Sequence, residues 1–367
     1  MIGMLLVGYT DCLSVTCGQI GGLTLLLIAV SGVLVMAFQA VEREKIAFPK
    51  EHWETRSPSQ LGINPAALER FKAHLNIPEA AGVVVRNGYL ADSWGQVDGK
   101  IGWMSATKPV FSTLLFFAIE RGLLRGADDL VGKWGWNLSP KDRTMTFRHL
   151  ANMVSGYACQ DPPGVAWAYN DFAIKLFHLT LERVFGKGLN DIAADCFAPL
   201  GLENGELFET KLYHVKTTPR DFARIGWFWM NRGMWDNRQV LPSKYFDAYM
   251  KPDVPADLPG TATPRADDYL KIGSFGGSHN QTLYDGRGAY GFCWWFNTQV
   301  GTTGRRFWPD APADAVLCIG YGGKVLVMLP SRGLMAAVKG NWGNPEPGKP
   351  EAIMNQALKL LADCVSP

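Results

Sequence analysis

The chain has 367 residues, of which 47% are hydrophobic and 19% are charged, and its formal net charge is +2. This length and apolar content suit one large domain or two lobes and exclude a disordered or low-complexity chain. The nearly balanced charge, without a long basic run, argues against a nucleic-acid partner. The seven cysteines and six histidines show no metal-ligand or disulfide spacing, so no metal or other cofactor is expected.

Residues 1–41 are predicted to be a hydrophobic anchor or a signal-like segment. Ile20 to Phe38 is an uncharged apolar run long enough to span a membrane. A cleaved signal peptide is disfavoured, because the start lacks basic residues and Phe38 stands where a small residue is wanted. We therefore favour an uncleaved membrane anchor. A true start of translation at Met36 is the alternative, and it would leave a soluble protein.

The side of the membrane is left open by the residues that follow this segment. Basic residues tend to stay in the cytoplasm, and several of them come directly after the apolar run: Arg43, Lys45 and Lys50. Residues 42–61 are then expected to form a polar connector, and residues 62–367 the folded domain.

The folded domain is predicted to begin with a helix and a β-hairpin. A helix is expected from Pro65 to about Leu75, because Asn64 is typical of an N-cap and proline is favoured in a first turn. The hairpin is expected on an Asn-Gly turn, with strands at residues 83–85 and 89–94.

The rest of the domain is predicted to be helical in the middle and to end in strands and a helix. Amphipathic helices are expected at residues 171–185 and 219–231. Three short strands and a final helix follow, at residues 315–319, 324–329, 334–338 and 351–362. This order predicts an α+β fold, in which one antiparallel sheet is flanked by helices and a mainly helical lobe is inserted at about residues 125–270.

Ser105 and Lys108 form a Ser-x-x-Lys pattern in a strongly apolar segment, from Trp103 to Leu124. A serine hydroxyl is a weak nucleophile, and a lysine three residues further along a helix can reach it to accept its proton. Pro109 is tolerable only if the helix has barely begun. Ser105 is therefore expected at the helix mouth, where backbone N–H groups favour negative charge. The alternative is a serine N-cap followed by a solvated lysine.

Two further patterns follow this one along the chain. A tyrosine stands just before an expected helix, and a glycine-rich turn lies between two expected strands, in the segments Tyr169-Asn170-Asp171 and Gly320-Tyr321-Gly322-Gly323-Lys324. The ordered set resembles the serine beta-lactamase and penicillin-binding-protein superfamily, in its class C beta-lactamase, esterase and D-aminopeptidase branch. The resemblance covers about residues 82–340 and implies a beta-lactamase/transpeptidase-like fold.

The resemblance also implies a role for each matched residue. Ser105 would be the nucleophile that accepts the acyl group, and Lys108 would be its partner in proton handling. Tyr169 would take the proton from Ser105 and pass it to the leaving group. The oxyanion hole would combine the backbone N–H groups of Ser105 and Lys324, on a substrate edge formed with Tyr321, Gly322 and Gly323.

Asp171 departs from the family pattern, which has asparagine at this position. If Asp171 faces Lys108, it would hold the amine protonated and raise the pKa of Tyr169. Alternatively, Asp171 is the N-cap of the next helix and Asn170 does the polar work.

Tyr321 is a second departure, because penicillin-binding relatives carry a cation there for a substrate carboxylate. Its presence favours esters or amides without that carboxylate; the alternative is that Lys324 or Arg332 replaces the cation. Several aromatic residues beside the motifs would line an apolar acyl pocket or belong to the core: Trp103, Tyr157, Trp167, Trp294 and Trp295.

The sequence thus predicts a serine hydrolase that forms an acyl-enzyme with a small ester or amide. A beta-lactamase or a D-amino-acid peptidase is the enzymatic alternative, and a non-catalytic ligand-binding or sensor domain of the same fold is the alternative of another class. The resemblance favours an anchored or exported protein on the periplasmic side, and a cytoplasmic location stays open. The sequence does not indicate an oligomeric state.

Overall fold

The computed structural model describes residues 46–366 except for 204, 263–265, 278–284, 301–302 and 344–351, together with the backbone of four strands in residues 1–45. The chain divides into two compact units, Met1–Ile46 and Ala47–Pro367. The first contains one antiparallel sheet of order β1-β4-β3-β2, with strands β1 (Leu6–Gly8), β2 (Cys17–Ile20), β3 (Leu23–Val30) and β4 (Val33–Ala40).

The apolar run in which a membrane span is predicted overlaps strands β3 and β4. They pair in antiparallel register from Leu23↔Ala40 to Val30↔Val33. Within the residues that the structure describes, no helix is both long enough and apolar enough to cross a membrane. The anchor over residues 1–41 therefore stays a prediction, and it is not formed as a helix here.

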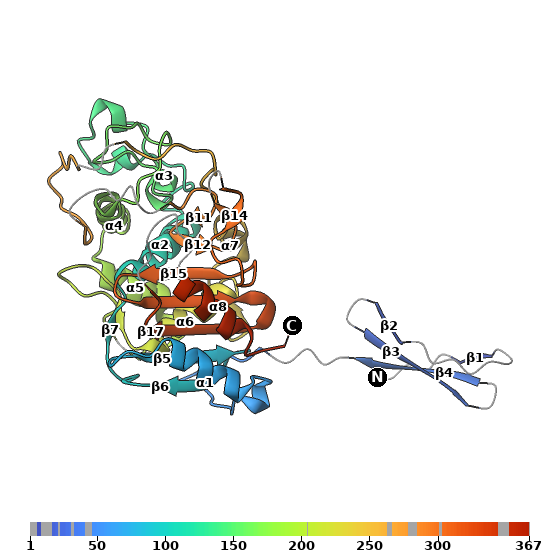
Figure 1. Ribbon diagram of the computed structural model, residues 1–367. Coiled ribbons are helices and arrows are strands. Elements are labelled where there is room, and N and C mark those ends of the chain that lie inside the picture. The colour runs from blue at the N-terminus through green and yellow to red at the C-terminus, as the bar shows by residue number, and fades with distance from the viewer. Residues whose placement is uncertain are drawn as a thin grey trace. The chain divides into compact units, whose positions relative to one another are not determined.

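The second unit is built on a seven-stranded antiparallel sheet of order β11-β12-β15-β16-β17-β5-β6 (Figure 1). Its strands come from both ends of the domain: β5 (Ala81–Arg86), β6 (Tyr89–Trp94), β11 (Tyr290–Gly291), β12 (Trp294–Phe296), β15 (Val316–Gly320), β16 (Lys324–Leu329) and β17 (Leu334–Lys339). Strand β17 joins the C-terminal strands to the N-terminal ones, because it pairs with β5 along its whole length. The predicted α+β fold, with a sheet joining remote strands, is confirmed.

The hairpin of β5 and β6 turns on Asn87 and Gly88, as predicted. Their φ angles are 50° and 88°, and a two-residue hairpin turn needs positive φ at both positions. Asparagine and glycine tolerate this conformation best, so this local sequence fixes the hairpin.

Helices cover both faces of the sheet. On one face α1 (Pro65–His74) packs against α8 (Ala352–Ala362), and α6 (Pro219–Met230) lies behind the sheet in Figure 1. Gly226 lets α6 approach closely, since a Cβ there would stand 2.7 Å from a methyl carbon of Leu326. The α6 helix falls within the range predicted for the helical lobe, but it packs on the sheet.

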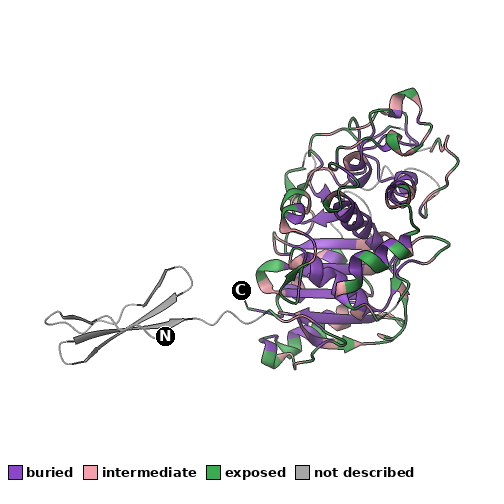
Figure 2. Cartoon of the chain, turned by 180° about the vertical axis from the view of Figure 1, so that it is seen from behind, coloured by how far each residue is buried: buried purple, intermediate pink, exposed green. Residues whose placement is uncertain are grey.

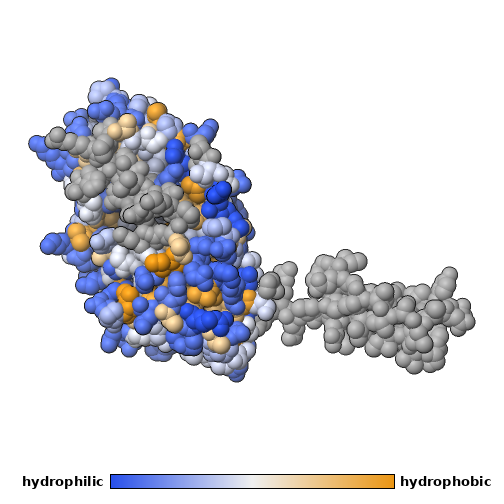
Figure 3. Space-filling view, in the orientation of Figure 1, coloured by the Kyte–Doolittle hydropathy of each residue, from blue (hydrophilic) through white to orange (hydrophobic). Residues whose placement is uncertain are grey.

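The helical lobe packs around α2, which is buried over nearly its whole length (Figure 2). Its helices are α2 (Lys108–Glu120), α3 (Phe147–Ala151), α4 (Asp171–Phe185), α5 (Leu189–Phe197) and α7 (Ser243–Tyr249). Short strands and 3-10 helices connect the larger elements: β7 (Ile101–Gly102), β8 (Lys216–Thr217), β9 (Met234–Trp235), β10 (Arg238–Gln239), β13 (Gln299–Val300), β14 (Arg305–Arg306), η1 (Ser59–Leu61), η2 (Met104–Thr107), η3 (Val131–Trp134), η4 (Pro140–Asp142), η5 (Ala198–Leu200) and η7 (Pro330–Arg332). In Figure 3 the described surface of this unit is mostly hydrophilic, with small hydrophobic patches.

His178 is a buried titratable side chain in the core of the lobe. Its ring stacks on Phe111 at 5.6 Å and lies 4.5 Å from the ring of Tyr213. Neither ring nitrogen has a hydrogen-bond partner among the described residues. Burial, aided by the charge of Lys175, lowers the pKa of His178 to about 3. Folding therefore holds this imidazole neutral at pH values where the unfolded chain protonates it.

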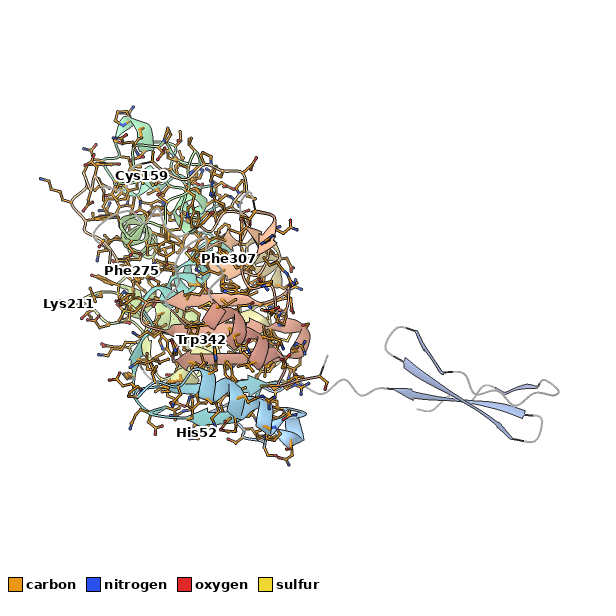
Figure 4. The ribbon with its side chains drawn as sticks, in the orientation of Figure 1. His52, Cys159, Lys211, Phe275, Phe307 and Trp342 are labelled. Atoms are coloured by element: carbon orange, nitrogen blue, oxygen red, sulfur yellow. The ribbon has the colours of Figure 1, made fainter. Side chains whose placement is uncertain are left out.

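We expect His178 to make the domain sensitive to acid. The unfolded state binds the extra proton below its ordinary pKa of about 6.5, so stability is lost as the pH falls from there toward about 3. Between pH 7 and pH 5 this loss is about 2 kcal/mol. Urea unfolding of His178→Leu should show a smaller loss than the parent protein. His52→Leu, at an exposed site labelled in Figure 4, should behave like the parent. An equal pH dependence in all three proteins would contradict the prediction.

Candidate active site

Ser105 lies in η2, directly before α2. This position is the expected one, because Pro109 is tolerable only in the first turn of a helix. The preceding residue, Met104, has a φ of 50°, a conformation that costs energy for a side chain of this size. The segment is held by neighbouring backbone: Trp103 N donates to Val215 O at 2.8 Å, and Val215 N donates to Thr107 Oγ1 at 2.8 Å. Ser105 is thus presented on a strained, fixed turn.

Lys108 joins the predicted residues into one cluster. Its Nζ lies 2.6 Å from Ser105 Oγ, 3.0 Å from Tyr169 Oη and 2.8 Å from Asp171 Oδ1. Its side chain is only 1% exposed, so the ammonium is satisfied by these oxygens in place of water. The alternative of a solvated lysine is therefore wrong.

The Tyr169 segment reaches this cluster from the start of α4. Asn170 is the N-cap of α4: its side chain accepts hydrogen bonds from Phe172 N at 3.0 Å and Ala173 N at 3.1 Å. The Asn170 amide also donates to Tyr157 O at 2.5 Å. The alternative that Asp171 is the N-cap is therefore wrong, and the carboxylate of Asp171 faces Lys108.

Asp171 shapes the electrostatics of the site. Burial lowers the pKa of Lys108, but the charge of Asp171 and the hydrogen bonds that Lys108 Nζ donates to Asp171 and Tyr169 outweigh burial, so this pKa is raised. Burial, together with the charge of Asp171, raises the pKa of the Tyr169 hydroxyl, which Lys108 lowers only in part. The resting cluster therefore contains a charged ammonium and a neutral phenol beside the Asp171 side chain.

The glycine-rich segment meets Ser105 through Gly320. A Cβ on Gly320 would stand 2.3 Å from Trp103 O and 3.1 Å from Ala106 N, so only glycine allows this approach of the strand. Lys324 pairs with Gly320 on one side and with Lys339 on the other. Because β16 is an interior strand, the prediction that the Lys324 N–H lines an oxyanion hole does not fit this pairing.

Gly322 and Gly323 form the turn between β15 and β16, with φ angles of 73° and 72°. A Cβ on Gly322 would stand 2.7 Å from Lys324 Nζ, and one on Gly323 would stand 2.0 Å from Gly340 O. These glycines shape the hairpin, and the close approach to the serine segment is made by Gly320. Arg332 lies at the opposite hairpin, where Nη1 donates to Val365 O at 2.6 Å, so it does not replace a cation beside Tyr321.

Of the aromatic residues proposed as a pocket, several belong to the core. Trp103 stacks on Phe222 at 4.4 Å, and Trp294 packs edge-on against Trp229 at 5.4 Å. Tyr157 is fully buried and hydrogen-bonds Asp268. Trp295 is different, because it stacks on the Tyr169 ring at 6.1 Å and in turn contacts Trp167 at 6.5 Å.

Sequence reasoning missed Phe275, which lies beside the cluster. Its ring centroid is 5.0 Å from Lys108 Nζ, and its N–H donates to Asp171 O at 3.0 Å. The sequence signal was limited to the neighbouring glycines Gly273, Gly276 and Gly277. In the described part of the chain, no group of three or more His, Cys, Asp or Glu side chains is placed to hold a metal ion.

The beta-lactamase family model matches residues 66–361. The chain belongs to the beta-lactamase family. An uncharacterized protein of Alkalihalophilus pseudofirmus is 23% identical over 285 residues, which cover 68% of this chain and 76% of the relative.

Solved structures share this fold. A penicillin-binding protein homologue from Caulobacter crescentus superposes with a TM-score of 0.57 at 14% identity, covering 83% of this chain and 99% of its own. EstCE1, a hydrolase with promiscuous acyltransferase activity, gives a TM-score of 0.55 at 13% identity, over 82% of this chain and 98% of its own. At these identities the likeness concerns the fold of the beta-lactamase family alone.

We expect Asp171→Asn to shift the pH dependence of Ser105 reactivity. In the predicted mechanism, activation of Ser105 requires loss of a proton from the Lys108–Tyr169 pair, and the carboxylate of Asp171 raises both pKa values. Without this charge the midpoint should move to lower pH by about one to two units. The rate of labelling by a fluorophosphonate, followed from neutral to alkaline pH, measures the midpoint.

The matched control for this prediction is Asp195→Asn, because Asp195 pairs with Lys187 on the exposed surface. This variant should keep the midpoint of the parent protein. A midpoint that stays in place or rises in Asp171→Asn would contradict the electrostatic role of Asp171.

Proposed function

We propose that this member of the beta-lactamase family is a serine hydrolase that acts on a small ester or amide through an acyl-enzyme at Ser105. The observation that carries the proposal is the convergence of Ser105, Tyr169 and Asp171 on the Lys108 ammonium within 3.0 Å. Activated serine nucleophiles share this arrangement of a hydroxyl beside a proton acceptor that a third group orients. The hydrolase activity named for the similar structure EstCE1 supports the same class of reaction.

The reactive form has lost one proton from the Lys108–Tyr169 pair, so that a phenolate lies beside an ammonium. Tyr169 Oη, which is hydrogen-bonded to Ser105, takes the serine proton as Oγ bonds to the carbonyl carbon. The phenol then returns this proton to the departing alkoxide or amine as the bond to the acyl group breaks. Water repeats the sequence on the acyl-enzyme, and Ser105 regains its proton when the acid is released.

The developing oxyanion needs two fixed donors. One is the backbone N–H of Ser105, in the strained turn before α2. For the second we propose the N–H of Tyr321 in place of Lys324. Ala315 O, directly before β15, accepts a hydrogen bond from Asn297 N, directly after β12, at 3.1 Å. Backbone groups alternate in direction along a strand. When the alternation of β15 is extended one residue past Gly320, the Tyr321 amide is directed to the same side as Ala315. Since β12 pairs only with the first part of β15, this edge is not covered by β12 near Gly320.

A fluorophosphonate probe tests the proposed function. Labelling of the parent protein and its loss in Ser105→Ala would support the hydrolase. Lys108→Met and Tyr169→Phe should label at least about 100-fold more slowly, because proton transfer is lost. A folded parent protein that does not label would contradict the proposal and favour a binding or sensor domain.

The substrate class is tested by comparing p-nitrophenyl esters with nitrocefin. We expect ester turnover to exceed nitrocefin turnover, because Tyr321 occupies the position from which relatives hold a substrate carboxylate with a cation. Efficient hydrolysis of nitrocefin would instead favour a beta-lactamase, and selective cleavage of D-amino-acid peptides would favour a peptidase.

The position of the second oxyanion donor has its own test. Tyr321→Pro removes the backbone N–H and should lower the acylation rate by about 100- to 1,000-fold. Tyr321→Ala removes the side chain and keeps the N–H, so it should retain most of the acylation rate on small esters. Equal acylation rates in the two variants would show that this N–H takes no part.

A further inference from the structure

The segment Phe275–Gly277 touches the active-site cluster at several points. The backbone N–H of Phe275 donates to Asp171 O at 3.0 Å, and Gly277 N donates to Asp171 Oδ2 at 3.0 Å. The ring of Phe275 lies 5.0 Å from Lys108 Nζ. One short segment therefore contacts both members of the buried ion pair.

Two aromatic rings lie within reach of the Lys108 ammonium. Nζ is 4.6 Å from the ring centroid of Tyr169 and 5.0 Å from that of Phe275. A cation within about 6 Å of a ring face is attracted to it, most strongly when water is excluded. Because Lys108 is 1% exposed, the Phe275 ring replaces part of the hydration that this ammonium loses.

The Phe275 ring is itself held in place by its neighbours. It packs edge-on against His214 at 4.5 Å and against Phe111 at 5.6 Å. Its exposed fraction is 1%, and the imidazole of His214 hydrogen-bonds the backbone of Phe275. The Phe275 ring, which is labelled in Figure 4, therefore has a fixed position relative to Lys108.

We propose that Phe275 is a positioning residue, which stabilises the protonated Lys108 amine and keeps Asp171 in contact with it. The inference deepens the proposed function and, for its effect on activity, rests on it. The titratable groups that interact electrostatically with Lys108 are Asp171, Tyr169, His214 and Cys293.

The first test is a double-mutant cycle of Phe275→Leu with Lys108→Met, followed by urea unfolding. If the ring stabilises the ammonium, Phe275→Leu should raise the unfolding equilibrium constant about tenfold more in the parent protein than in Lys108→Met. Phe177→Leu, a fully buried ring on α4, is the control and should show no such coupling. Equal coupling for Phe275 and Phe177 would overturn the inference.

The second test is the pH dependence of fluorophosphonate labelling. Loss of the ring should shift the midpoint of Phe275→Leu about one unit to lower pH, while Phe177→Leu keeps the midpoint of the parent. An unshifted midpoint in Phe275→Leu would overturn the role of the ring. If the folded parent does not label at any pH, the proposed function fails, and the unfolding cycle still decides whether Phe275 holds Lys108.

Discussion

A buried ammonium is the interaction on which the organisation of this domain depends. Lys108 is almost fully buried. A buried ammonium is stable only when it donates hydrogen bonds to oxygen atoms and is paired with an opposite charge. The oxygens come from η2 and from the start of α4, and Phe275 adds an aromatic ring. Three segments that are remote in sequence, at residues 105–108, 169–171 and 275–277, must therefore come together around the Lys108 ammonium.

Asp171 gives this member of the beta-lactamase family its own electrostatic character. A carboxylate beside Lys108 makes burial of the ammonium tolerable, but it also opposes the proton loss that a nucleophilic serine needs. The same contact thus favours the folded site and disfavours its activated form. Trp295 stacks on Tyr169, and Phe275 lies beside Lys108, so each of the two proton-carrying groups packs against an aromatic ring.

Local elements were predictable wherever a few residues decide the conformation. The Asn87-Gly88 turn fixed one hairpin, and the range of α4 followed from its apolar periodicity. Patterns along the chain do not say which surface an element contacts, so α6 was placed in the lobe although it packs on the sheet. For the same reason the sequence suggests Lys324 as an oxyanion donor, although β16 pairs on both sides and its amide is inside the sheet. The contact of Phe275 with Lys108 arises only on folding, so no sequence pattern indicates it.

The central claim is that Lys108 joins Ser105, Tyr169 and Asp171 into one reactive site. A crystal structure of the protein after reaction with a small fluorophosphonate tests it most directly. Our account predicts phosphorus bonded to Ser105 Oγ, with Lys108 Nζ still in contact with Tyr169 and Asp171 and the phosphonyl oxygen about 3 Å from the N–H groups of Ser105 and Tyr321. A phosphonyl group on another residue, or a Lys108 side chain turned away from Tyr169 and Asp171, would contradict it.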